Sequence, residues 1–376
     1  MRIVEVRLHW IRIGFHEPFR ISSGEVSAKD AIVVELVAED GSRGWGEASP
    51  MAGAFYSVET PESTWKFLRD RLVPSFLARP EPACREKLDP MSCFEQLSEF
   101  PGEPFAKAGL EGAVWDLRAT LERKPLWALL GGSARAIESG AAIGLFPTLE
   151  ELLERVRRFL TEGYRRIKIK IAPGSDVALV SAVREHFGGI PLMVDANAAY
   201  RLEDAGIFEE LDRFDLLMIE QPLARRALEE HAELQRRLRT PICLDESAED
   251  LAAVREIIRL KSARILNIKV QRMGGLGPAK LAHDLGQAAG IPCWLGTMPE
   301  LGIASAQGLH LATLPNFRYP TDVEASERWF VDDIISPPIE VSHEGLIEIP
   351  EGPGMGYRVA AEKLSGASIL TERVQL

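Results

Sequence analysis

Five charged residues recur at almost equal intervals along the middle of the chain. They are 25, 25, 25 and 24 residues apart in turn: Lys170, Asp195, Glu220, Asp245 and Lys269. One strand, one helix and two short loops together occupy about 25 residues. The spacing therefore predicts that one structural position returns five times.

Apolar segments alternate with amphipathic ones beyond residue 133. We expect strands at 141–146, 166–171, 191–196, 215–220, 241–246, 264–270 and 291–297, and an eighth at 318–323. Helical stretches such as 250–260 and 277–290 separate them. Alternating strands and helices require a parallel sheet, and eight strands favour a closed barrel over an open sheet. No GxGxxG motif follows the first strand, which argues against a dinucleotide-binding fold.

The first 133 residues follow a different pattern. Residues 1–60 alternate apolar and polar side chains, as an antiparallel meander does, with loops expected at 19–24 and 50–56. Residues 62–130 are helical in pattern, and Gly131-Gly132 ends that region. We therefore expect one domain over 1–133, a barrel over 134–320 and a C-terminal segment over 321–376.

Composition excludes several classes of partner. The formal net charge of −12 opposes binding to nucleic acid. No segment approaches the ~18 consecutive apolar residues of a membrane span, so we expect a cytoplasmic protein that does not bind membranes. The four cysteines are too widely spaced for a metal–thiolate site: Cys84, Cys93, Cys243 and Cys293.

Strand alternation orients the five charged residues. In the strand at 166–171, Ile167 and Ile169 face the covering helices, so Lys168 and Lys170 face the barrel interior. The same rule places all five residues at strand ends on one side, and the carboxyl ends of barrel strands meet at one mouth. Each residue alone could be an ordinary surface charge. Five in register have no good structural explanation.

Three carboxylates in one mouth need a counter-charge, because like charges raise one another's pKa. Oxygen ligands without histidine or cysteine select a hard cation and argue against zinc. Three carboxylates that leave room for water and substrate suit Mg²⁺ better than Ca²⁺, and Mn²⁺ would also fit.

The two lysines flank the expected metal site. A lysine acts as a base when burial and like charges lower its pKa from ~10.4 to about 7–8, and Lys168 beside Lys170 would have this effect. We therefore expect Lys170 and Lys269 to remove a proton alpha to a carboxylate, with a cation stabilising the enediolate.

These motifs resemble the enolase superfamily in its muconate-lactonizing subgroup. The resemblance is carried by Lys168-Ile169-Lys170, Asp195-Ala196-Asn197, Glu220-Gln221-Pro222, Asp245-Glu246-Ser247 and Asn267-Ile268-Lys269. The superfamily itself is a standard example of a Lys or His base acting with Mg²⁺. Within it the chain is most similar to o-succinylbenzoate synthases that also racemise N-succinylamino acids. The resemblance implies an α/β fold, a modified TIM barrel (β/α)7β, with an α+β capping domain built from both termini.

The resemblance also implies residue roles. Asp195, Glu220 and Asp245 match the Mg²⁺ ligands, and Lys170 and Lys269 match the two catalytic groups. In the synthase reaction, a dehydration in menaquinone biosynthesis, the first lysine takes the proton and helps hydroxide to leave. In racemisation both lysines exchange protons. Supporting positions match Lys168, Asn197 and Glu246.

Substrate contacts are expected from two N-terminal loops and from the rim after the seventh strand. The candidates are Phe19, Arg20, Ser23, Met51, Phe55, Gly296, Met298 and Glu300. The run Gly296-Thr297-Met298-Pro299-Glu300 departs from the family pattern, which leaves substrate identity open. Asp322-Val323-Glu324 resembles the Asp-x-Asp of dipeptide epimerases only in part.

Three functions are compatible with these residues. The first is the synthase, a lyase acting on a small carboxylate, with racemase activity as a second capacity. The second is a racemase, epimerase or cycloisomerase on another carboxylate such as an N-acylamino acid, a dipeptide or muconate. The third, a non-catalytic barrel, would not need so costly a set of buried charges. A homo-oligomer is expected.

Overall fold

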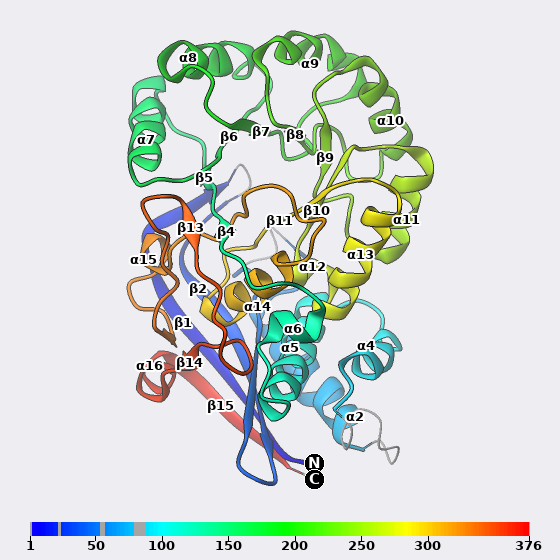
Figure 1. Ribbon diagram of the computed structural model, residues 1–376, viewed down its shortest axis with the longest axis vertical. Coiled ribbons are helices and arrows are strands. Elements are labelled where there is room, and N and C mark those ends of the chain that lie inside the picture. Colours follow the sequence, from blue (N-terminus) through cyan, green and yellow to red (C-terminus); the bar gives the residue numbers. More distant parts are fainter. Residues whose placement is uncertain (1, 22–23, 53–56, 79–87, 376) are drawn as a thin grey trace.

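Both ends of the chain enter one antiparallel sheet. The structure is a computed structural model that describes residues 2–21, 24–52, 57–78 and 88–375. The sheet has the order β15-β1-β2-β3, and its strands are Ser368–Gln375, Ile3–Ile21, Gly24–Ala38 and Arg43–Ala48. Because β15 pairs with β1, the two termini lie together (Figure 1).

The loop expected at 19–24 is wrong in part. Phe19 pairs with Val26 and Ile21 with Gly24, so β1 and β2 form one long hairpin that includes most of this segment. Its tip, residues 22–23, lies outside the described residues. Ladder hydrogen bonds override the polar, small-residue composition that indicated a loop.

A group of helices follows β3 in the chain, and α1 and α5 pack directly on this sheet. They are α1 (Pro61–Phe67), the π-helical turn η1 (Leu68–Leu72), α2 (Val73–Ala78), α4 (Pro90–Ser98), α5 (Pro104–Leu121) and α6 (Leu126–Leu130). Helix α5 lies directly on β3, because a Cβ atom at Gly46 would approach the carbonyl oxygen of Gly109 to 2.0 Å. Glu47 of β3 also accepts hydrogen bonds from the amides of Leu301 and Ala304, which puts the end of β3 beside the barrel.

A curved parallel sheet forms the second unit. Its order is β11-β10-β9-β8-β7-β6-β5, and its strands, from β5 to β11, are Ala141–Ile143, Ile167–Lys170, Leu192–Asp195, Ile219–Glu220, Ile242–Leu244, Ile265–Ile268 and Cys293–Leu295. All lie within the predicted strand ranges but are shorter. Figure 1 shows them inside an arc of helices.

The covering helices follow the strands in turn. They are α7 (Leu149–Thr161), α8 (Val177–Phe187), α9 (Ala205–Leu211), α10 (Leu228–Arg237), α11 (Leu251–Leu260), α12 (Val270–Met273), α13 (Leu276–Ala288) and α14 (Gly302–Ala312). Short 3-10 turns at Leu202–Asp204 and Asp212–Phe214 flank α9. Thr148 caps α7 by accepting a hydrogen bond from the Glu151 amide.

The eighth strand predicted at 318–323 is not a regular strand. Instead, segment 317–324 closes the barrel through scattered backbone hydrogen bonds: Arg318 N–H donates to Cys293 O (3.0 Å), and Gly140 N–H donates to Thr321 O (2.9 Å). Pro320 has no N–H to contribute, which interrupts the ladder. We call residues 317–324 the closing segment.

Short elements complete the C-terminal region. They are β4 (Ile137–Glu138) paired with β13 (Leu346–Ile347), β12 (Ile335–Ser336) paired with β14 (Arg358–Val359), α15 (Ser326–Trp329) and α16 (Ala361–Ala367). In the described parts of the chain we find no helix with the length and apolar character needed to cross a bilayer.

The barrel separates apolar and charged layers. Its outward-facing strand residues pack with the helices in one large core. Inside, a small apolar cluster contains Met193, Met218, Cys243, Ile265 and Trp294. Met193, Met218 and Cys243 each precede a carboxylate of the site by two residues, on the same face of the strand. The charged side chains therefore rest on an apolar floor.

Candidate active site

The five regularly spaced residues lie at the same end of the barrel sheet. Lys170 is the register partner of Asp195, and Asp195 is the partner of Glu220. Asp245 directly follows β9, and Lys269 directly follows β10. The three carboxylates are therefore on adjacent strands, with one lysine on the strand at each side.

Each lysine is bound to a carboxylate. Lys170 Nζ lies 2.6 Å from Asp195 Oδ2 and also donates to Asn197 Oδ1. Lys269 Nζ lies 2.9 Å from Asp245 Oδ2. We expected the pKa of Lys170 to be lowered, and that expectation is wrong in this structure. Burial and Lys168 do lower the pKa of Lys170, but the attraction to Asp195 outweighs them, so the net shift is upward.

Lys168 lies deeper in the barrel and is held by two carboxylates. Its Nζ lies 2.5 Å from Asp322 Oδ2 and 3.3 Å from Glu220 Oε2. Burial opposes the charged form, yet these carboxylates, helped by Asp195, raise the pKa of Lys168 well above its usual value. The side chain is a permanent buried cation.

Two of the three carboxylates, Glu220 and Asp245, have pKa shifts of opposite direction. Burial and the neighbouring Asp195 and Asp245 raise the pKa of Glu220 to about 8. Although burial opposes it, Arg272 and Lys269 hold the pKa of Asp245 far below its ordinary value. Burial and two neighbouring negative charges therefore outweigh the positive charge that Lys168 and Lys269 bring to Glu220, the middle carboxylate.

The donor set fits a hard divalent cation, though the side chains are turned towards lysines. Among the described residues, no three Asp, Glu, His or Cys side chains are already grouped as metal ligands. Glu220 Oε2 is buried and accepts no hydrogen bond, and Glu246 Oε2 is in the same condition. These oxygens and the raised pKa of Glu220 are features that a cation among the carboxylates would satisfy.

Supporting polar groups hold the strand ends in place. Asn197 donates from Nδ2 to Glu246 Oε1 (3.1 Å), and its backbone N–H donates to Asp195 Oδ1 (2.9 Å). Gln221 Oε1 accepts from the amides of Asp245 and Ser247, at 3.1 Å each. This bridge fixes the direction of Asp245.

Four residues in this network were not assigned roles from the sequence. Asn267 donates to Glu220 Oε1 (2.8 Å), Arg272 binds Asp245, Asp322 binds Lys168, and Gln221 is the bridge described above. Asn267 shares a strand face with Lys269, and Arg272 follows Lys269 by one helical turn, so both had a local signal. Asp322 was noted only as part of a partial Asp-x-Asp motif, and nothing local indicated its contact with Lys168, which is 154 residues away.

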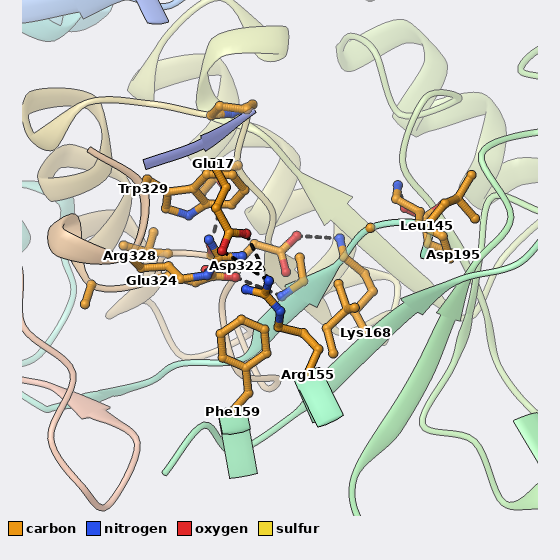
Figure 2. Close-up of a pocket in the computed structure, with 18 of the residues that line it drawn as sticks. Glu17, Leu145, Arg155, Phe159, Lys168, Asp195, Asp322, Glu324, Arg328 and Trp329 are labelled. Atoms are coloured by element: carbon orange, nitrogen blue, oxygen red, sulfur yellow. Dashed lines mark hydrogen bonds and ion pairs between the residues drawn. The ribbon is translucent and has the colours of Figure 1, made fainter. Parts of the chain in front are cut away.

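A cavity of about 1100 Å³ opens above these residues and extends towards α7 and α15. Met298 and Glu300, two predicted substrate contacts, line it together with Lys170 and Lys269. Figure 2 shows Lys168 directed at Asp322, with Glu324 and Arg328 beyond.

The other predicted substrate contacts either do not line this cavity or fall outside the described residues. Gly296 packs against Asn267, where a Cβ atom would come within 2.2 Å of Asn267 Oδ1. Met51 is buried, with its sulfur 3.9 Å from Lys29 Nζ. Ser23, Phe55 and the side chains of Phe19 and Arg20 fall outside the described residues.

Fold and site together define a family. Residues 3–131 match the mandelate racemase / muconate lactonizing enzyme N-terminal domain, and residues 151–363 match the enolase C-terminal domain-like family. The chain belongs to the enolase superfamily, and its fold is the modified TIM barrel with a capping domain that the resemblance implied.

Two relatives and one solved structure show which members of the superfamily this chain resembles. The chain is 45% identical over 359 residues to an o-succinylbenzoate synthase of Geobacillus stearothermophilus, covering 96% of this chain and 94% of the relative. It is 40% identical over 359 residues to an N-succinylamino acid racemase of Thermus thermophilus, covering 96% and 95%. The crystal structure of an enolase superfamily member from Listeria innocua superposes with a TM-score of 0.94 at 35% identity, covering 100% and 99%.

Proposed function

We propose that this protein is an o-succinylbenzoate synthase that also racemises N-succinylamino acids. The observation that carries the proposal is the placement of Lys170 and Lys269 on the strands at either side of three carboxylates. Some relatives that match nearly the whole chain are named synthases and others racemases, which supports a single site with both activities.

The chain's own residues account for the proton transfers. Lys170 acts in its neutral form, so it must first lose the proton that its contact with Asp195 favours. It then takes the proton from the carbon alpha to the substrate carboxylate, and the resulting ammonium gives a proton to the departing hydroxyl group, which leaves as water. In racemisation Lys269 delivers a proton to the opposite face of the same carbon. One lysine therefore suffices for elimination, whereas racemisation needs both.

We further propose that Asp195, Glu220 and Asp245 hold Mg²⁺ or Mn²⁺. A cation there would supply positive charge against the negative charge that develops on the substrate carboxylate. Lys168 and Asn267 hold Glu220 in place from below, and Asn197 holds Asp195. A cytoplasmic location, a homo-oligomeric state and a place in menaquinone biosynthesis are proposals that follow from the family resemblance.

The test uses purified protein with Mg²⁺ in two assays, elimination to o-succinylbenzoate and racemisation of an N-succinylamino acid. We expect Lys170→Ala to reduce both rates by at least about a thousandfold, because the base is lost. Lys269→Ala should abolish racemisation while one enantiomer still exchanges its alpha proton with deuterated solvent. Circular dichroism checks that both variants fold.

Three results would contradict the proposal. These are normal turnover in Lys170→Ala, racemisation without Lys269, and alpha-proton exchange that continues unchanged in excess chelator. Elimination without racemisation would support the synthase alone, and the reverse result would support the racemase alone.

A further inference from the structure

The cavity extends beyond the lysines to a gap in the barrel wall. At the seam between β5 and the closing segment, the amide of Ala142 donates to the carboxylate of Glu324 (2.8 Å) and not to a backbone carbonyl. A side chain thus replaces one rung of the ladder. The cavity passes this point and is lined there by Glu324, Arg328 and Trp329.

Arg328 lies at this far end with its guanidinium clamped between aromatic rings. Its Cζ lies 4.5 Å from the ring centroid of Trp329 and 5.0 Å from that of Phe159. The side chain is 14% exposed, and its charge is offset by Glu324, whose Oε2 lies 3.1 Å from Nε. Stacking and the ion pair hold the guanidinium in one orientation before any ligand binds.

The hydrogen-bonding capacity of Arg328 is not used within the described part of the chain. Nε is buried without a hydrogen bond, because the approach to Glu324 is an ion pair of poor hydrogen-bond geometry. The two terminal nitrogens likewise have no hydrogen-bond partner among the described residues. A guanidinium carries five N–H donors in a planar fork, so this one is equipped for a planar oxyanion.

The other arginines that line the cavity are already engaged. Arg155 donates to both carboxylate oxygens of Glu17, at 3.2 and 3.0 Å. Arg158 donates to Glu162 at 2.7 Å and is 55% exposed. Among the described arginines that line this cavity, Arg328 is therefore the one whose N–H donors are unused.

We propose that Arg328 is a binding site for the second, distal carboxylate of a dicarboxylate substrate. The substrate carboxylate next to the reacting carbon would lie at the lysines, and the end of its acyl chain would reach the guanidinium. The inference rests on the proposed function, because succinyl compounds carry such a second carboxylate. If so, Arg328, beside the closing segment, determines whether the enzyme prefers succinyl substrates to substrates with an uncharged acyl group.

The test compares two substrates that differ in the distal carboxylate, the N-succinyl and N-acetyl derivatives of one amino acid. For Arg328→Met we expect the ratio of their kcat/KM values to fall about 10- to 100-fold, mainly through a higher KM for the succinyl substrate. Arg328→Lys keeps the charge but loses the planar fork, so a smaller fall is expected. Arg157→Met on the outer face of α7 is the matched control, because Arg157 is 55% exposed and pairs with Glu154.

The inference is overturned if Arg328→Met and Arg328→Lys both keep the wild-type ratio within about twofold. Using a ratio separates substrate choice from partial loss of folded enzyme. If the wild-type protein turns over neither substrate, the proposed function fails by itself. Calorimetric titration with N-succinylglycine and N-acetylglycine then decides the inference: tighter succinyl binding that depends on Arg328 supports it, and equal Kd values overturn it.

Discussion

Asp322 shows how one residue can make two buried cations tolerable. Its carboxylate lies 2.5 Å from Lys168 Nζ and 2.6 Å from Arg166 Nη2, and both cations stack against Trp294. Although burial opposes ionisation, the two partners lower the pKa of Asp322 to about 2. Arg166, Lys168 and Asp322 thus form an ion triad beneath the candidate active site.

We expect Asp322→Asn to lower the free energy of unfolding by about 3–5 kcal/mol, because it removes the counter-ion of buried Arg166 and one of the two counter-ions of buried Lys168. Urea denaturation at neutral pH measures this. The matched control is Asp332→Asn, since Asp332 is 62% exposed and forms a surface pair with Lys363. The control should change stability by about 0.5 kcal/mol or less. Equal effects of the two substitutions would refute the role given to the triad.

Among the helices, α14 is linked to two other segments of the chain by a neutral histidine, His310. His310 Nδ1 accepts a hydrogen bond from the Trp127 amide (3.1 Å), and its Nε2–H donates to Met355 O (2.9 Å). One nitrogen must be an acceptor, so a protonated ring cannot make both contacts. Burial accordingly lowers the pKa of His310 to about 4.

This gives a pH dependence with a definite sign. The unfolded pKa is 6.5 and the folded pKa about 4, so the unfolded chain binds the proton first as pH falls. The contribution of His310 is complete above about pH 6.5 and should fall by about 2 kcal/mol between pH 7 and 5.

Urea denaturation of the wild type and His310→Gln at both pH values measures the effect, because other titrating groups are common to both proteins. We expect the stability difference between them to shrink at pH 5. A difference that stays constant would show that His310 does not titrate in this range.

At the scale of the whole molecule, two carboxylates of the capping domain bind the starts of two barrel helices. Glu47 of β3 accepts from the amides of Leu301 (2.8 Å) and Ala304 (2.9 Å) at α14. Glu111 of α5 accepts from the amides of Leu276 and Gly277, at 2.7 Å each, at α13. Negative side chains at helix N-termini satisfy free N–H groups and favour the helix dipole.

We expect Glu47→Ala to lower the free energy of unfolding by about 3 kcal/mol, because two buried amides lose their acceptor. Glu39→Ala, in the exposed turn after β2, is the control and should change it by about 0.5 kcal/mol or less. Urea denaturation distinguishes the two. A Glu47 variant as stable as the control would mean that the two hydrogen bonds of Glu47 do not stabilise the joint between cap and barrel.

Local pattern was sufficient for the barrel and its charged strand ends. The 25-residue interval and strand alternation placed Lys170, Asp195 and Glu220 on one side of adjacent strands, where the register puts them. Both the interval and the alternation can be read along the chain without knowing which distant residues are in contact. The irregular closing segment was not visible in the same way, because side chains make part of its bonding.

The sequence by itself therefore determined the repeating strand–helix unit, the direction of the side chains on its strands, and which five charged residues stand at the strand ends. The tertiary structure decided which charges meet. Only folding brings Asp322 to Lys168, leaves Arg328 stacked with unused donors, and raises the pKa of Lys170 where a lowered one was expected. Electrostatic energies depend on distances between residues far apart in the chain, and no local pattern contains those distances.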